Sequence, residues 1–170
     1  MINWDLIVEK LMETRSHNPG TFRVGIYSRM SMTEGQESVA QTHVKWMKMA
    51  VQRDPRFQIA KVCQDFGVTT KDYKKMLGLR ELLDDCVKGD IDVVMAFDLS
   101  RLGRSYDELM ANVAPISQLE TEVGVLILHD KLFLLGSQAC EWAEKMARGD
   151  YSSCRLPYFV DAMPLPRGHS

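Results

Sequence analysis

Two segments of the chain place arginine and serine directly after strand-like apolar runs. Residues 28–31 read Ser-Arg-Met-Ser and follow the run from Phe22 to Tyr27. Residues 98–104 read Asp-Leu-Ser-Arg-Leu-Gly-Arg and follow the run from Ile91 to Phe97. Arginine binds phosphate oxygens through a planar fork of N–H donors, and an activated serine hydroxyl is a common nucleophile. These residue types in this arrangement favour chemistry on a phosphodiester.

The elements around these segments determine whether the two can meet. Apolar periodicity predicts strands at residues 22–28, 57–63, 91–97 and 123–128, and residues 132–135 are able to form a short fifth strand. It predicts helices at residues 3–15, 37–53, 77–88 and 105–120, and a further short helix at 137–148. Such alternation is typical of right-handed crossovers in a parallel sheet, whose carboxyl strand ends converge on one crevice. We therefore expect an α/β fold with a mainly parallel sheet of four to five strands and helices on both faces.

Local signals mark the ends of several predicted helices. Asn3 is the expected N-cap of the first helix. Ser105 and Glu108 have the spacing of a capping box, and Gly89 closes the helix at 77–88. The signal weakens after Gly136, and residues 149–170 read as an irregular tail.

The predicted helix at 37–53 has an apolar face of its own. Val39, His43, Trp46 and Ala50 recur at helical spacing and are expected to form that face. On it, His43 is expected to be a core or interface residue rather than a catalyst. The methionines of this helix are interpreted as ordinary packing residues and not as a binding groove.

Composition limits the class of protein. With 170 residues, 45% of them apolar and 26% charged, the chain is typical of one soluble domain with a tail. It has no apolar run near the roughly 20 residues of a membrane span and no secretory signal, so we expect a cytoplasmic protein. The net charge of -2 argues against a protein that holds nucleic acid through bulk positive charge.

Cysteine and histidine usage gives no sign of a metal site. The four cysteines are widely spaced, with no pair separated by two residues, and the four histidines are scattered. Cys63 and Cys86 lie in apolar-periodic segments, where we expect buried, reduced thiols. Neither spacing is that of a zinc site, so no metal is expected.

The motifs resemble the catalytic domain of the serine recombinases, the resolvase/invertase family, over about residues 22–130. The first strand and its end give Tyr27-Ser28-Arg29-Met30-Ser31, and the third gives Ser100-Arg101-Leu102-Gly103-Arg104. Gln41 on the next helix and Asp65 after the second strand match further family positions. The resemblance implies a flavodoxin-like or resolvase-like fold and cleavage of DNA by a serine nucleophile.

The resemblance also implies roles for single residues. Ser31 would attack a DNA phosphodiester and form a 5′-phosphoserine link, while Arg29, Arg101 and Arg104 stabilise the charge on the phosphate. The expected phosphate-binding or supporting residues are Tyr27, Gln41, Asp65, Lys74, Lys75 and Ser100. No metal, nucleotide or other cofactor is implied. The implied partner is DNA, bound by a homodimer that pairs into a tetramer at synapsis, with no membrane involved.

The chain departs from the family pattern in three places. Before Gly78 the family usually supplies an arginine, whereas this chain has Lys74 and Lys75, which act only as point charges. Ser100 stands where aspartate is common. After His129 we recognise neither the family's long helix nor its DNA-binding domain. We therefore expect an N-terminal helical extension at 1–21, a catalytic domain at 22–136 and a tail of uncertain structure at 137–170.

Other interpretations stay open at this point. The chain could be a truncated or degenerate recombinase domain that only dimerises or modulates a partner, which the net charge favours. An unrelated flavodoxin-like domain that binds a small phosphorylated ligand is weaker, because no glycine-rich loop follows the first strand. Ser31 could be a simple N-cap, Asp65 a local cap, and Arg101 and Arg104 solvated surface charges.

Overall fold

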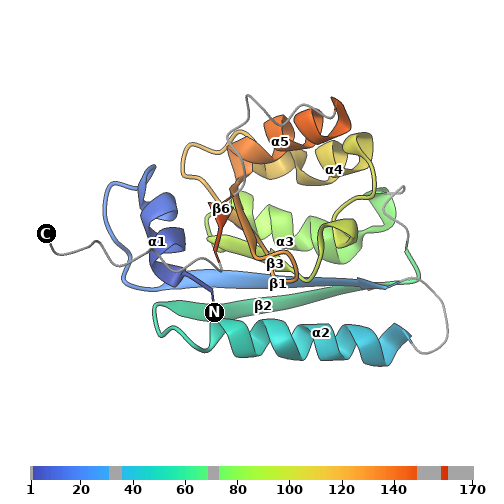
Figure 1. Cartoon of the computed structure of the whole chain (residues 1–170), viewed down its shortest axis with the longest axis horizontal. Coiled ribbons are helices and arrows are strands. Elements are labelled where there is room, and N and C mark those ends of the chain that lie inside the picture. Colours follow the sequence, from blue (N-terminus) through green and yellow to red (C-terminus); the bar gives the residue numbers. More distant parts are fainter. Residues whose placement is uncertain (1, 31–35, 69–72, 149–157, 161–170) are drawn as a thin grey trace, which may run out of the picture.

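A single twisted sheet organises the computed structural model, which describes residues 2–30, 36–68, 73–148 and 158–160 (Figure 1). Its strands lie in the order β2-β1-β3-β4-β5-β6. β1 to β4 are parallel, whereas β5 and β6 run antiparallel to their neighbours. The strand bounds are β1 Phe22–Met30, β2 Phe57–Phe66, β3 Val93–Ala96, β4 Gly124–Ile127, β5 Leu132–Leu135 and β6 Tyr158–Phe159.

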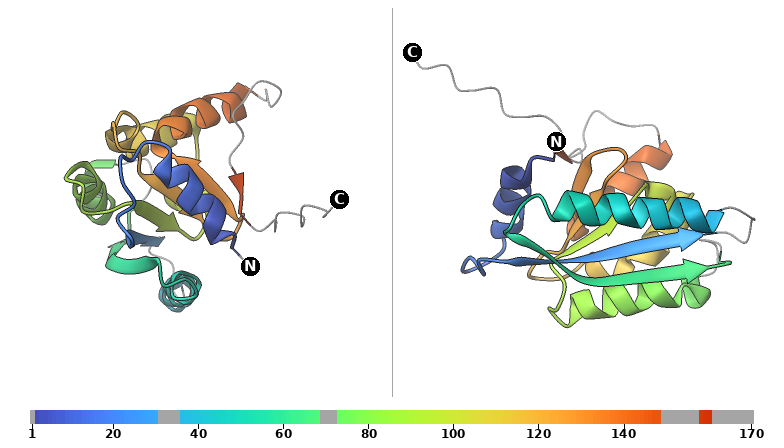
Figure 2. Two further views of the ribbon diagram at one scale, coloured as in Figure 1. Left: turned by 90° about the vertical axis from the view of Figure 1, so that its left-hand side faces the viewer. Right: turned by 90° about the horizontal axis from the view of Figure 1, so that it is seen from below.

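Helices cover both faces of this sheet, as Figures 1 and 2 show. One face packs against α1 (Trp4–Met12) and α2 (Gln36–Val51). The other packs against α3 (Leu77–Val87), α4 (Tyr106–Val113) and α5 (Gly136–Arg148). Three short 3₁₀ turns are η1 (Tyr73–Lys75), η2 (Leu99–Arg101) and η3 (Ala114–Ile116). The predicted fold class, a mainly parallel α/β sheet with helices on both faces, is confirmed.

The central strands contribute to two separate cores because successive side chains point to opposite faces. In β3, Val93 and Met95 pack on the α1/α2 side, whereas Val94 and Ala96 pack on the α3/α4 side. All four are buried. A strand that is covered on both faces reads as a continuous apolar run, which is the pattern seen in the sequence.

Several predicted element ends differ from the structure; α1 ends at Met12 rather than residue 15, and β2 continues to Phe66 rather than ending at residue 63. β1 continues to Met30 rather than ending at residue 28, because its last residues pair with β2 in parallel register, Arg29 opposite Asp65. α4 ends at Val113 rather than near residue 120, because Pro115 has no backbone N–H to donate to the preceding turn, although Ala114 itself keeps helical dihedral angles. The chain continues there as the 3₁₀ turn η3.

α2 faces the sheet with a different row of residues from the predicted one. Ala40, Val44, Met47 and Val51 are buried against the sheet. The predicted apolar face is rotated away from that row, and its Val39 and Trp46 are about half exposed, at 48% and 49%. α2 therefore carries two apolar rows, and periodicity alone selected the outer one.

The C-terminal segment adds structure that the sequence did not predict. The predicted short helix at 137–148 is present as α5, but residues 158–159 also form the sixth strand, β6, beside β5. Val160 is fully buried, and its backbone bonds to Lys131 and Asn3. Part of the predicted irregular tail is thus ordered by hydrogen bonds to distant backbone. A two-residue strand is too short to show a periodic pattern in the sequence.

Both cysteines expected in the core are there. Cys63 and Cys86 are buried and free. Burial raises the pKa of Cys63 to about 11 and that of Cys86 to about 12, so both stay protonated thiols at neutral pH. No helix among the described residues combines the length and the apolar character needed to cross a membrane.

Candidate active site

The carboxyl ends of β1 and β3 are joined by one buried arginine. Arg29 is only 1% exposed, and its guanidinium donates hydrogen bonds to backbone carbonyl oxygens from two loops. Nη1 bonds to Val68 after β2 at 3.0 Å, and Nη2 bonds to Ser100 after β3 at 3.1 Å. Nε lies 3.4 Å from the carbonyl oxygen of Arg101. Arg29 thus fixes the three strand ends relative to one another.

Arg101 completes this cluster from the other side. Its Nη1 donates to the carbonyl oxygen of Arg29 at 3.0 Å, so each arginine bonds to the backbone of the other. Its Nε lies 3.4 Å from a carboxylate oxygen of Asp98. The Ser100 hydroxyl donates to the other oxygen of Asp98 in a short hydrogen bond. The turn η2 therefore presents Arg101 in a fixed position, partly open to solvent.

The electrostatics of this end of the sheet suit an anion. Burial lowers the pKa of Arg29, and the nearby charges of Arg104 and Arg101 lower it further. The positive charges of these arginines repel one another. An anion bound between them would reduce that repulsion. By contrast, Arg15 and Arg23 at the opposite end of the strands are both paired with the buried carboxylate of Asp92.

Arg104 lies at the exposed edge of the cluster, directly before α4. Its backbone N–H donates to the Glu108 carboxylate at 2.8 Å, and the Ser105 hydroxyl accepts from the Glu108 N–H at 3.3 Å. Ser105 is the N-cap of α4, as predicted. The Glu108 side chain reaches one residue beyond the position that a capping box requires. This arrangement fixes the backbone of Arg104 and leaves its side chain exposed.

Gly103 allows the arginine-bearing turn to lie directly against α4. A Cβ atom at this position would come within 2.6 Å of the backbone nitrogen and 2.8 Å of the Cα of Leu109. The buried side chain of Asn112 holds the same contact by donating to the carbonyl oxygen of Leu102. The glycine between Leu102 and Arg104 is thus required by close backbone packing.

Replacing Gly103 by alanine should force this turn and α4 apart. Because the clash involves backbone atoms, we expect the free energy of unfolding to fall by about 1–3 kcal/mol, which urea denaturation measures. Gly20 provides the contrast, since a Cβ there meets nothing within 4 Å, although its φ of +80° adds its own strain. Stability unchanged in Gly103→Ala would contradict the packing argument.

Tyr27 and Asp65 form a second, fully internal group. The Tyr27 hydroxyl donates to Asp65 Oδ2 at 2.8 Å, and burial together with this bond raises the Tyr27 pKa above its ordinary value. The Asp65 carboxylate also accepts from the backbone N–H groups of Gly78 at 2.8 Å and Leu79 at 3.1 Å. These are free donors of the first turn of α3. The geometry favours the interpretation of Asp65 as a local cap that holds α3 against β2.

Asp65→Asn should destabilise the protein without altering the chemistry of the folded fraction. An amide offers one acceptor oxygen, so it leaves the N–H of Gly78 or Leu79 facing its NH₂ group. We expect the free energy of unfolding to fall by about 1–3 kcal/mol in urea denaturation. The exposed Asp107 gives the matched control, and its Asn variant should stay within about 0.5 kcal/mol of the parent.

The structure brings some predicted site residues together and leaves others apart. Arg29, Ser100 and Arg101 are in direct contact, whereas Gln41, Lys74 and Lys75 have exposed side chains on α2 and η1. Ser31, the predicted nucleophile, lies outside the described residues. In the chain it follows Met30, the last residue of β1. The roles of all these residues stay predictions.

Two supporting residues were not identified from the sequence. Asp98 binds both Ser100 and Arg101, and its position three residues before the arginine was the available signal. Asn112 was marked only by being polar on the inward face of a helix, beside Leu109 and Val113. Among the described residues, no three His, Cys, Asp or Glu side chains are grouped closely enough to hold a metal ion.

Comparison with known proteins gives one family and several structural neighbours. The family model for the N-terminal domain of resolvase matches residues 24–132. The fold is similar to that of a resolvase family site-specific recombinase from Streptococcus pneumoniae, with a TM-score of 0.57, 17% sequence identity, and coverage of 75% of this chain and 87% of that one. A search of curated proteins found no match.

Two further solved structures are more distant. The N-terminal catalytic domain of TP901-1 integrase has a TM-score of 0.48 and 19% identity, with coverage of 65% of this chain and 81% of that one. The C-terminal catalytic domain of ISC1926 TnpA, an IS607-like serine recombinase, has a TM-score of 0.47 and 18% identity, with coverage of 63% and 69%.

Proposed function

The chain belongs to the resolvase family of serine recombinases, and on that premise we propose that it cleaves and rejoins DNA through a covalent 5′-phosphoserine link at Ser31. The supporting observation is the arginine cluster of Arg29 and Arg101, with Arg104 at its edge. It lies at the carboxyl ends of β1 and β3, and β1 leads directly into the segment that contains Ser31.

The proposed reaction is a transesterification. The Ser31 oxygen attacks phosphorus and loses its proton, the bond from phosphorus to the 3′ oxygen breaks, and that oxygen takes up a proton. The DNA 5′ phosphate is then esterified to Ser31. Attack by a 3′-hydroxyl on the phosphoserine reverses these changes and releases the serine. Because an ester is present at every stage, rejoining needs no nucleotide or other cofactor.

The arginines act on the phosphate, where charge builds as the new bond forms. Donors already in position stabilise such charge without having to reorganise during the reaction. Arg101 and Arg104 are open enough to meet a phosphate oxygen, whereas Arg29 is held by backbone carbonyls. We therefore assign Arg101 and Arg104 to direct phosphate contact and Arg29 to positioning and long-range charge. DNA in the cytoplasm is the proposed substrate, acted on by a homodimer that pairs into a tetramer.

Covalent capture tests this function without knowledge of the target site. The protein is incubated with a randomised duplex pool that carries 3′-bridging phosphorothiolate linkages, so that cleavage releases a thiol that rejoins poorly. A label at the 3′ end of the downstream fragment should move with the protein in denaturing gels. A label carried instead by the upstream fragment would show the opposite polarity and contradict the mechanism.

A non-catalytic role is the second candidate, and the net charge of -2 favours it. A domain of this kind would dimerise or bind another recombinase without cutting DNA. Its discriminating result is the absence of any adduct together with little shift of random duplex in a low-salt gel. Binding of duplex that weakens steeply with salt would count against it, because salt dependence reports phosphate contacts.

A further inference from the structure

The outer face of α2 carries large apolar side chains that the fold leaves uncovered. Val39, Trp46 and Met49 are 48%, 49% and 47% exposed. The other two tryptophans of the chain, Trp4 and Trp142, are each only 7% exposed. A contiguous exposed apolar row of this kind is typical of an interaction surface. The buried row of α2 is the one that meets the sheet, and Trp4 at the start of α1 borders the outer row.

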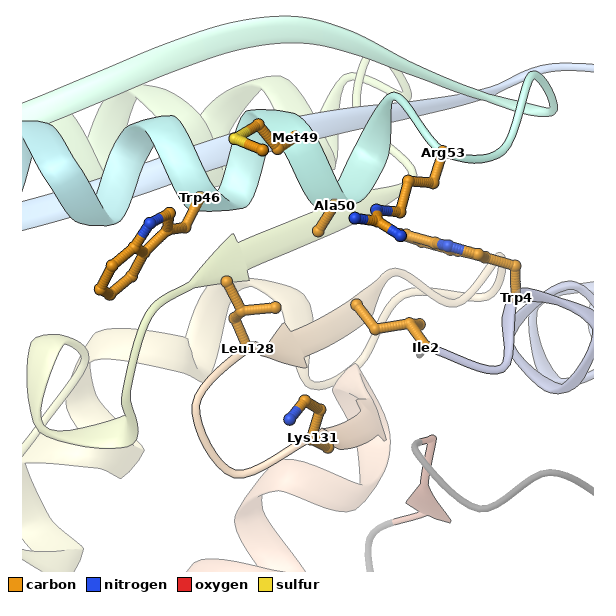
Figure 3. A pocket seen from close by; sticks show the side chains of 8 residues that line it. All are labelled: Ile2, Trp4, Trp46, Met49, Ala50, Arg53, Leu128 and Lys131. Carbon is orange, nitrogen blue, oxygen red and sulfur yellow. The ribbon is translucent and has the colours of Figure 1, made fainter.

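A groove extends this surface beside the second half of α2. Its volume is about 500 Å³. Trp46, Met49 and Ala50 of α2 line it together with the apolar Ile2, Trp4 and Leu128 and the cationic Arg53 and Lys131, as Figure 3 shows. The ring of Phe97, which follows β3, supports Trp46, since the centroids of the two rings are 5.9 Å apart. An aromatic side chain that is already fixed makes a strong anchor at an interface, because little freedom is lost on binding.

The outer row is symmetric about Trp46 in both position and chemistry. His43 and Met49 lie three residues away on either side, Thr42 and Ala50 four, and Val39 and Arg53 seven. Any helical face has this positional symmetry, so residue types decide whether it can meet itself. In a face that meets itself across Trp46, His43 would lie opposite Met49 and Thr42 opposite Ala50. Arg53 would lie opposite Val39 rather than opposite a second cation.

Charge does not oppose contact between two such faces. Lys45 and Lys48 lie on another flank of α2, beside Gln64 of β2. Burial and the charge of Arg101 lower the pKa of His43, with Asp98 raising it and His129 lowering it, so His43 is neutral at pH 7. Within α2 the row is therefore uncharged, and two cations lie beside it, Arg53 just after the helix and Lys131 in the lining of the groove. An apolar row of this kind is better suited to pack against an equivalent apolar row than to bind DNA. Binding to DNA requires cationic side chains that contact the phosphates.

We propose that this face binds the same face of a second copy of the chain, with the two α2 helices antiparallel across a two-fold axis at Trp46. Each residue then meets its counterpart across the axis, as an isologous contact requires. Residues 41–51 of the two helices then lie along each other, and residues 36–40 of each extend past the end of the other helix, over its groove. One symmetry operation thus fills both grooves.

The size of the contact sets the expected strength. α2 has 16 residues and is therefore about 24 Å long. A standard interface buries roughly 800 Å² per partner, more than one helix face offers, so the groove walls must contribute. We expect a dissociation constant in the micromolar range, roughly 1–100 µM. The association needs no DNA and no catalysis, so it stands or falls separately from the proposed function.

Sedimentation velocity without DNA tests the association. The parent protein should show a concentration-dependent dimer between about 1 and 100 µM. Trp46→Asp should raise the dissociation constant at least about 30-fold, the effect of losing a central anchor. Leu77→Asp is the matched control, since Leu77 is 66% exposed on α3 but lies outside this face, and it should leave the dimer intact. A parent that stays monomeric at 100 µM would overturn the proposal.

Cysteine cross-linking tests the geometry itself, with the parent treated in parallel to show any cross-linking of its own cysteines. Helices 8–10 Å apart place the two copies of residue 46 within about 4–6 Å between Cα atoms, which suits a disulfide. Trp46→Cys should therefore cross-link to itself. Val39→Cys should not, because its two copies lie about 21 Å apart along the helices, yet it should cross-link when mixed with Arg53→Cys. Self-linking of Val39→Cys, or none by Trp46→Cys, would overturn the antiparallel arrangement.

Discussion

Ser31→Ala is expected to abolish formation of the covalent protein–DNA adduct. The substitution removes the only oxygen that the proposed mechanism joins to phosphorus, and water in its place would give hydrolysis rather than an adduct. The loss should be at least about four orders of magnitude, as for other enzymes that lose their nucleophile. The measurement is the amount of labelled downstream fragment that moves with the protein in denaturing gels.

Ser28→Ala is the matched control for this variant. Ser28 precedes Ser31 by three residues, lies within β1 and is 6% exposed, so it tests the loss of a serine hydroxyl at the same strand. It should give adduct within a few-fold of the parent. Both variants should keep the unfolding transition of the parent in urea. Adduct that persists in Ser31→Ala would move the nucleophile elsewhere and remove the central assignment of the mechanism.

Arg29→Met is expected to separate activity from stability. Methionine has a similar length and no charge, so it removes three hydrogen bonds to carbonyl oxygens but also removes the cost of burying a cation. These effects oppose each other, and the free energy of unfolding should change by less than about 2 kcal/mol. Cleavage should nevertheless fall about 100- to 1,000-fold, because positioned positive charge is lost at the phosphate.

Two further variants sharpen this result. Arg29→Lys keeps the charge but has no planar fork to reach three carbonyl oxygens, so its activity should lie closer to that of Arg29→Met than to the parent. Arg15→Met removes a partly buried arginine at the opposite end of the sheet, where it pairs with Asp92 at 3.1 Å. It should lose stability by about 1–3 kcal/mol while its folded fraction cleaves normally. Arg29→Met within tenfold of the parent in cleavage would show that Arg29 is purely structural.

The sequence allowed the fold class and the meeting of two arginine-bearing segments to be predicted. Continuous apolar runs such as Val93–Ala96 form only where a strand is covered on both faces, and the helices between them impose parallel pairing. Once that topology is accepted, the segments after the first and third strands must meet at one edge of the sheet. The contact between Arg29 and the turn at Ser100 and Arg101 follows from this reasoning.

Apolar periodicity did not predict the buried face of a helix that has two apolar rows. α2 has apolar residues on both its inner and outer rows, and only the position of β1 and β2 beneath it buries Met47 rather than Trp46. The extension of β1 from Ser28 to Met30 depended in the same way on the partner strand β2, since a charged residue such as Arg29 gives no strand signal.

The chain by itself thus determined which residues we propose for the chemistry, because residue type and spacing are local properties: an arginine two residues before a serine after one strand, and two arginines after another. Only the tertiary structure decided the surroundings of the arginines. It buries Arg29 among backbone carbonyls, leaves Arg101 and Arg104 more open, and turns Asp65 toward the amides of α3. The physical reason is that burial and hydrogen-bond partners come from residues that are 13 to 72 positions apart in the sequence, as Asp65 is from Gly78 and Arg29 is from Arg101, and no local pattern encodes them.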